Sequence, residues 1–278
     1  MRPVLKFAVL SSFLWLALAG CKREAGPQPG PAQPEAPGTG EVAPVAGPAV
    51  GELKEVIETT DRYIVGISYP PVVNQYPGLA RVVSEYAEAA RAELLQAVAG
   101  FGNDKPAAPY ELSLAFEQTV KSPQIVAISA DGSRYTGGAH GEPLVARFVW
   151  LPEHNELLTT AALVPKAEGW AAIAGYVREQ LHTEVSVRAD ADEMSPEERQ
   201  RFVRSADKMI DAGTQPDVDN FSQFQPILGA DGKVVALRFV FPPYQVAPYS
   251  EGTRTVDVPA SLLLPLVAPE YKALFRAG

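Results

Sequence analysis

A glycine-rich loop around one histidine is the segment of this chain best suited to chemistry. Residues 135–141 read Tyr-Thr-Gly-Gly-Ala-His-Gly. Glycine permits positive φ and brings main-chain amides close to a ligand, and an imidazole both donates and accepts hydrogen bonds. Paired with Glu142, His140 could serve as acid and base in a hydrolase; alternatively, it satisfies carbonyls around a tight turn. The candidate contact residues here are Tyr135, Thr136, Gly137, Gly138, His140 and Gly141.

A second candidate surface is the proline-rich segment 241–252, which reads Phe-Pro-Pro-Tyr-Gln-Val-Ala-Pro-Tyr-Ser-Glu-Gly. Proline removes a backbone donor, so we expect this segment to leave its sheet as an edge or a loop. Rigidly presented tyrosines bury large areas at interfaces, although both rings could instead cover the core. The candidate contact residues are Pro242, Tyr244, Pro248 and Tyr249.

Other reactive groups are sparse. The three histidines, His140, His154 and His182, lack the spacing of metal ligands, and no glycine-rich phosphate loop is present. A Gly-x-Ser-x-Gly nucleophile motif is also missing from the sequence. We therefore expect no metal, no cofactor and no catalytic residue.

The only cysteine, Cys21, follows Leu-Ala-Gly at the end of a short apolar stretch. A positive start, an apolar segment over 7–19 and small residues before Cys21 are typical of a lipoprotein signal peptide, too short to span a membrane. The alternative is an ordinary secretory signal with an incidental cysteine. We expect Cys21 to be acylated and to hold the protein at the outer membrane on its periplasmic side, because Lys22 is not the Asp of inner-membrane retention.

Composition and charge describe the chain that follows the signal peptide. Loss of the signal, with Arg2 and Lys6, lowers the formal net charge from −9 to −11. Such a protein repels nucleic acid and attracts cationic partners, although acidity also serves solubility. The proline-rich stretch after Cys21 buries little and is expected to act as a tether. The predicted parts are a signal peptide at 1–20, a Pro/Gly-rich tether at 21–52, and one α+β domain in two associated parts, 53–155 and 156–278.

Periodicity predicts a largely antiparallel sheet with helices on one face. Helices are indicated from Leu79 to a cap at Gly100, along an apolar stripe from Trp170 to Leu181, and from a Ser195 capping box to about Ala212. The hairpin signal Asp231-Gly232 joins the last two strands. The expected strands cover residues 62–69, 110–120, 124–130, 143–150, 221–228 and 234–241.

The two candidate segments together resemble a known family. A Tyr-Thr-Gly-Gly-Ala-His-Gly loop followed about a hundred residues later by Pro-Tyr-x-Val-Ala-Pro-Tyr-x-x-Gly is similar to the extracytoplasmic domain shared by the anti-sigma factor RsiV and the non-catalytic part of the peptidoglycan deacetylase PdaC. The resemblance implies an α+β fold in two parts and a binding role. In RsiV this region is a receptor for lysozyme.

These observations favour a lipid-anchored, non-catalytic envelope module. Its expected ligand is a lysozyme-like cationic protein or peptidoglycan, bound by the glycine loop together with Tyr244 and Tyr249. The alternatives are a wall hydrolase or deacetylase that uses His140, and a structural lipoprotein that only scaffolds other envelope proteins.

Overall fold

The computed structural model describes residues 51–102, 104, 106–192 and 194–276. The predicted signal peptide, the lipidation of Cys21 and all of the tether except its last two residues, Gly51 and Glu52, lie outside the described residues. Within the described part of the chain, no helix is long and apolar enough to cross a membrane.

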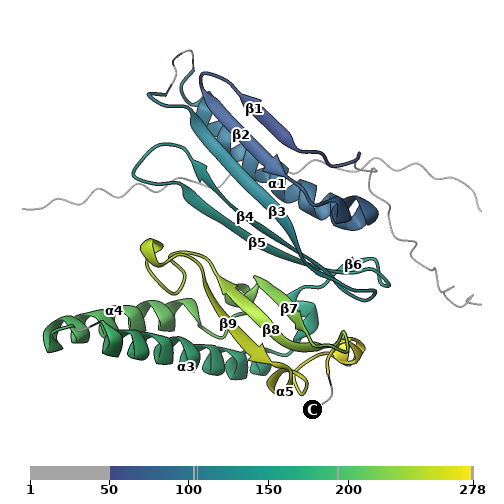
Figure 1. The fold of residues 1–278 in the computed structure, drawn as a ribbon, viewed down its shortest axis with the longest axis vertical. Helices are drawn as coiled ribbons and strands as arrows, with labels where there is room; N and C mark the ends of the chain where they lie inside the picture. The colour runs from purple at the N-terminus through teal and green to yellow at the C-terminus, as the bar shows by residue number, and fades with distance from the viewer. Residues whose placement is uncertain (1–50, 103, 105, 193, 277–278) are drawn as a thin grey trace, which may run out of the picture. The chain divides into compact units, whose positions relative to one another are not determined.

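The first sheet has six strands in the order β1-β2-β3-β4-β5-β6 (Figure 1). All neighbours are antiparallel except β2 and β3, which are parallel because the long helix α1 carries the chain back between them. The elements are β1 (Val56–Thr59), β2 (Tyr63–Ser68), η1 (Pro71–Gln75), α1 (Pro77–Ala99), β3 (Tyr110–Lys121), β4 (Val126–Tyr135), β5 (Glu142–Leu151) and β6 (Glu156–Leu157).

Helix α1 covers one face of this sheet (Figure 1), and its buried residues form a single apolar stripe. Leu79, Val83, Ala87 and Leu94 recur at helical spacing and are fully buried. They pack against strand residues that alternate toward the helix. The strand side of this core includes Val65, Ile67, Leu112, Leu114, Phe116, Ile128 and Phe148.

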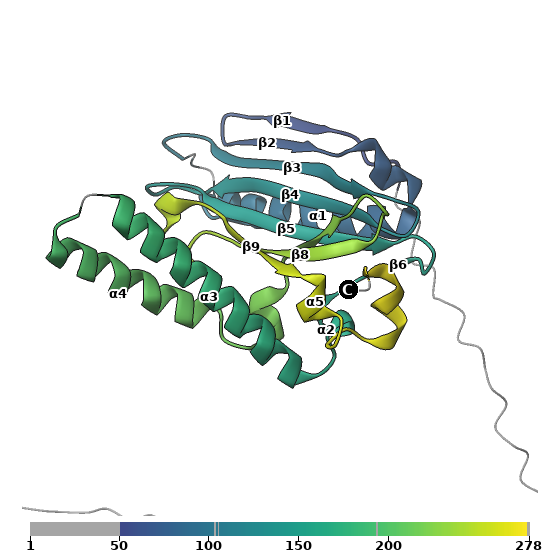
Figure 2. The same cartoon turned by 60° about the horizontal axis from the view of Figure 1, so that its bottom comes forward.

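The second part combines a three-stranded antiparallel sheet, in the order β7-β8-β9, with a long helical hairpin (Figure 2). Its core is rich in phenylalanine: Phe221, Phe224, Phe239 and Phe241 are all buried. The elements are α2 (Thr160–Leu163), α3 (Ala167–Ala191), α4 (Pro196–Gly213), η2 (Val218–Phe221), β7 (Phe224–Leu228), β8 (Val234–Phe241), η3 (Tyr249–Glu251), β9 (Arg254–Pro259), α5 (Ala260–Leu263) and η4 (Pro269–Leu274).

Strands β4 and β5 are shared by both cores. Ile128 and Phe148 face the α1 side, whereas Ala127 and Val149 belong to the core around α3. Alternate strand residues point to opposite faces, so one strand pair serves two layers. The amide of Arg147 also donates to Gln223 Oε1 at 2.8 Å, which connects β5 to the segment before β7. The two parts therefore pack as associated halves of one unit.

The predicted α+β class in two parts is confirmed, as are the capping box of Ser195 and the hairpin at Gly232, where φ is 76°. The predicted C-cap of α1 at Gly100 is also confirmed, with a right-handed φ of −58°. Phe221, in contrast, was expected in a strand but lies in η2, because its ring packs under Trp170 rather than joining the sheet.

The Gly232 hairpin contains an acid-sensitive contact. Arg276 donates hydrogen bonds to both Asp231 oxygens, at 2.7 and 3.0 Å, and together with the Lys233 amide it lowers the pKa of Asp231 from its ordinary 3.8 to about 2. A depressed carboxyl pKa stabilises the fold above the unfolded value, and this contribution is lost as the pH falls toward about 2.

Asp231→Asn should therefore be less stable than wild type at neutral pH, and the difference should disappear between about pH 4 and pH 2. Urea midpoints across this range measure it. A stability difference that persists at pH 2 would contradict the assignment, and Asp192→Asn serves as a control at another surface carboxylate paired with an arginine.

Candidate functional site

The predicted histidine loop connects β4 to β5. Gly137 and Gly138 both have positive φ, at 96° and 99°, so this connection requires residues without a Cβ. The loop ends at Gly141 and presents His140 as an exposed side chain. The glycines therefore serve to place the imidazole rather than to fill space.

The predicted proline-rich segment forms the loop between β8 and β9. Its turn is closed by Tyr244 N donating to Ala247 O at 2.9 Å and Gln245 N donating to Pro242 O at 3.1 Å. Val246 and Ala247 are buried beneath it. Gln245 connects the loop to the end of α4 and to η2, because its Nε2 donates to Gly213 O and to Asn220 O.

The two loops meet. Tyr244 Oη lies 2.9 Å from His140 Nε2, and the ring of Tyr249 stacks on the imidazole with centroids 4.1 Å apart and planes at 14°. The two tyrosine rings are 5.6 Å apart. We call His140, Tyr244 and Tyr249 the aromatic cluster; it joins residues 104 positions apart in the chain.

The hydrogen bonds assign the tautomer of His140. Nδ1 lies 3.2 Å from the carbonyl oxygen of Gly141, which only accepts. Nδ1 therefore carries the hydrogen, and in the neutral imidazole Nε2 then accepts from the hydroxyl of Tyr244. Both ring nitrogens of His140 thus make hydrogen bonds that hold the cluster together. Tyr244 nevertheless remains accessible, with 53% of the residue exposed.

Nearby carboxylates are paired with arginines. Glu142 accepts from Arg134 at 2.5 Å, and Arg134 also contacts Glu93 on α1. Glu251 lies 3.1 Å from Arg188. The His140 and Glu142 pair that an acid–base mechanism would need is thus not formed in this structure. Among the described residues, no group of three or more His, Cys, Asp or Glu side chains gathers as a metal site.

The other predicted contact residues surround the cluster without joining it. Tyr135 turns toward Tyr110, with edge-to-face rings, and its hydroxyl donates to Gly138 O at 3.3 Å. Thr136 is exposed, and Pro248 is the exposed N-cap of η3. Pro242 accepts the turn bond from Gln245. These residues shape the two loops.

Sequence reasoning missed Gly213 and Gln245, which no local pattern marks as partners. A Cβ on Gly213 would collide with the carbonyl oxygen of Gln245. Gly213→Ala should therefore displace the loop that carries Tyr244 and destabilise the fold by about 1–3 kcal/mol, as overpacking does.

Chemical denaturation measures this loss. The matched control is Gly175→Ala inside α3, where a Cβ meets nothing within 4 Å and should stabilise by about 0.5–1 kcal/mol. Equal effects at the two glycines would contradict the proposed collision.

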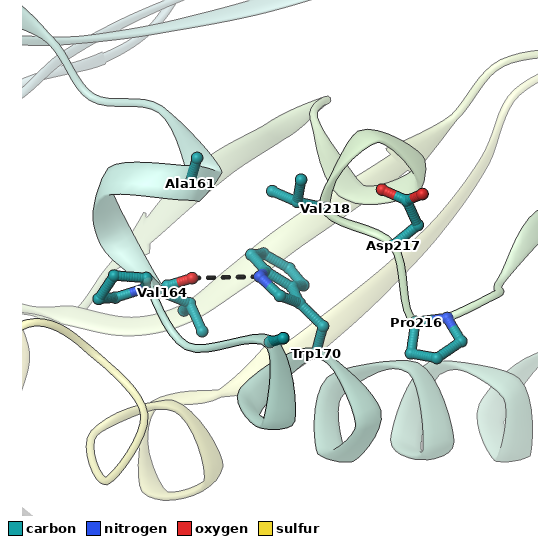
Figure 3. Close-up of a pocket in the computed structure, with 8 residues that line it drawn as sticks. Ala161, Val164, Trp170, Pro216, Asp217 and Val218 are labelled. Atoms are coloured by element: carbon teal, nitrogen blue, oxygen red, sulfur yellow. Dashed lines mark hydrogen bonds between the residues drawn. The ribbon is translucent and has the colours of Figure 1, made fainter.

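A separate pocket of about 310 Å³ lies between the start of α3 and the segment 216–218 (Figure 3). Trp170 is one of its lining residues, and its indole nitrogen donates to Val164 O at 3.1 Å. None of the predicted contact residues lines it.

The fold and site define an α+β protein of two associated parts with an exposed aromatic cluster between their loops. The chain matches the family described as "Deacetylase PdaC" over residues 57–142 and the family described as "Protein of unknown function (DUF3298)" over residues 163–261. It therefore carries a PdaC domain followed by a DUF3298 domain, as the resemblance predicted. His140 lies in the first match, and Tyr244 and Tyr249 lie in the second.

Two crystal structures are similar to this chain. A DUF3298 family protein from Pseudomonas aeruginosa PAO1 is 18% identical, with 81% of this chain and 94% of that chain covered and a TM-score of 0.49. A member from Bacteroides fragilis NCTC 9343 is 15% identical, with coverage of 78% and 92% and a TM-score of 0.47. No curated protein matches the chain.

Proposed function

We propose that this protein is a non-catalytic binding module of the cell envelope, and that the aromatic cluster is its contact surface. The observation that carries the proposal is the conformation of Tyr244. Its φ is 74°, a strained value for a bulky residue, yet the residue is 53% exposed. Strain of this kind costs about 1–3 kcal/mol and concentrates at functional sites.

A core role does not explain this conformation. The ring of Tyr244 contacts His140 and Tyr249 at the surface, while Val246 and Ala247 provide the buried anchor of the loop. Rigid tyrosines offer a flat apolar face with a polar edge, which suits either a sugar ring or the side chains of a protein partner. Such a surface binds rather than transforms its target.

The proposed cellular location of the module rests on the sequence. The PdaC domain belongs to a family associated with the extracytoplasmic space. Acylation of Cys21 would hold the protein at the outer membrane on the periplasmic side, and the tether would let the domain reach the wall.

The ligand we favour is a cationic wall-associated protein of the lysozyme kind, with peptidoglycan as the second candidate. The acidic charge of the chain would raise the encounter rate of a basic protein and would do nothing for a neutral glycan. Binding steered in this way weakens as salt rises.

Isothermal calorimetry of the full chain against hen-type lysozyme and against muropeptides, at low and at near-physiological ionic strength, tests the proposal. Salt-sensitive lysozyme binding supports the first ligand, and heat from muropeptides alone supports the second. Tyr249→Ala should lose binding, whereas Ile57→Ala, at a large apolar residue on β1 that is 72% exposed, should not. Turnover of a glycosidic, amide or ester bond by the purified chain would reject the proposal.

A further inference from the structure

A second pocket, separate from the aromatic cluster, is lined by residues at the start of α3 and in the segment after α5. Its volume is about 340 Å³, within the range of small-ligand sites. Ala268 N donates to Leu163 O at 2.9 Å, which joins the two walls. The apolar lining is made of Pro165, Gly169, Pro265, Leu266, Val267, Ala268 and Pro269.

Two lysines give this apolar pocket a positive rim. Lys166 and Lys272 line it and are exposed, and neither forms an ion pair with any residue that the structure describes. By contrast, Arg91, Arg134 and Arg238 are all paired with carboxylates. One acid, Glu168, also lines the pocket, so the charged lining is net positive.

We propose that this pocket binds a short peptide that ends in a free carboxylate and carries small apolar side chains. The carboxylate would lie between Lys166 and Lys272, where it gains two charge-assisted contacts. The proline, leucine and valine walls accept methyl-sized side chains without a polar partner. The positive end of α3 adds to the same field, although the lysines carry the argument.

The site is independent of the proposed function at the aromatic cluster. Gly169 lines the pocket at one end of α3, and Arg188 near the other end pairs with Glu251 in η3. These positions are roughly 28 Å apart at about 1.5 Å per residue. Part of the pocket, residues 265–272, also lies beyond the matched DUF3298 region, which ends at residue 261.

The test uses N-acetyl-alanyl-alanine and its C-terminal amide as probes of the ¹⁵N-labelled full chain by NMR. We expect the acid to shift the amides of Gly169, Leu266 and Lys272 with a Kd of about 1 mM, which is ordinary for a ligand of this size. The amide, which lacks the charge, should bind at least about tenfold more weakly.

Substitutions at the two lysines test whether they bind the carboxylate. The double variant Lys166→Gln and Lys272→Gln should bind N-acetyl-alanyl-alanine about tenfold more weakly, with an unchanged melting temperature. Lys208→Gln on α4 should leave the affinity unchanged. Equal binding of acid and amide, or no shift at the pocket amides, overturns the proposal. Hexanoate that binds as tightly as the dipeptide also overturns it, because the occupant would then be an acyl chain.

Discussion

Tyr244→Gly is expected to weaken ligand binding strongly while leaving the protein at least as stable as wild type. Glycine adopts a φ of 74° without strain, so the change should release about 1 kcal/mol after the entropic cost of glycine. Loss of an interface tyrosine typically costs about 2 kcal/mol of binding or more, which is roughly 30-fold in Kd. Calorimetric titration and thermal unfolding measure the two effects separately.

The matched control is Asn155→Gly, because Asn155 is the other non-glycine residue with positive φ among those described, at 51°. It should keep full binding. Tyr244→Phe, which retains the ring but loses the hydrogen bond to His140, should fall between wild type and Tyr244→Gly. The interpretation fails if Tyr244→Gly unfolds more readily than wild type and binds as well.

Phe221→Ala should produce the largest loss of stability, about 3–5 kcal/mol, as is usual when a buried phenylalanine is truncated. Phe221 is 1% exposed, and its ring lies 5.6 Å from Trp170 and 5.5 Å from Phe239. Its removal leaves a cavity at the centre of the second core. Urea unfolding monitored by far-UV circular dichroism provides the measurement.

Phe202→Ala on α4 is the corresponding control. Phe202 is only half-buried, and its ring lies 5.4 Å from the guanidinium carbon of Arg188, a contact worth about 1 kcal/mol near the surface. A loss at Phe202 as large as that at Phe221 would show that the phenylalanine core does not dominate stability.

Short sequence motifs predicted the elements well wherever the stabilising interactions lie within a few residues of one another. Ser195 followed by Pro196 begins α4 with a complete capping box, because both groups lie within one turn. The three glycines of the histidine loop and the prolines of 242–248 exclude regular pairing by their own backbone chemistry. The loops that carry His140 and Tyr244 were therefore predictable from their residues.

Elements that form through contacts with distant residues were harder to predict from the sequence. The strands β1 and β9 were not predicted. β1 has only four residues, and β9 alternates exposed Thr255 and Asp257 with buried Val256 and Val258 over only six residues that end at Pro259. Each strand forms by pairing with a neighbour. The parallel pairing of β2 with β3 follows from how α1 crosses the sheet. The place of Phe221 in η2 follows from the packing of Trp170 and Phe241 around it.

The sequence by itself indicated an α+β chain that resembles the domain shared by RsiV and PdaC, with two loops held out of the sheets and rich in contact-forming residues. Only the tertiary structure decided that His140 bonds to Tyr244 and stacks on Tyr249, that Glu142 pairs with Arg134, and that Tyr135 turns away toward Tyr110. Backbone preference acts within a few residues, whereas these contacts depend on β4 and β5 being packed between two hydrophobic cores.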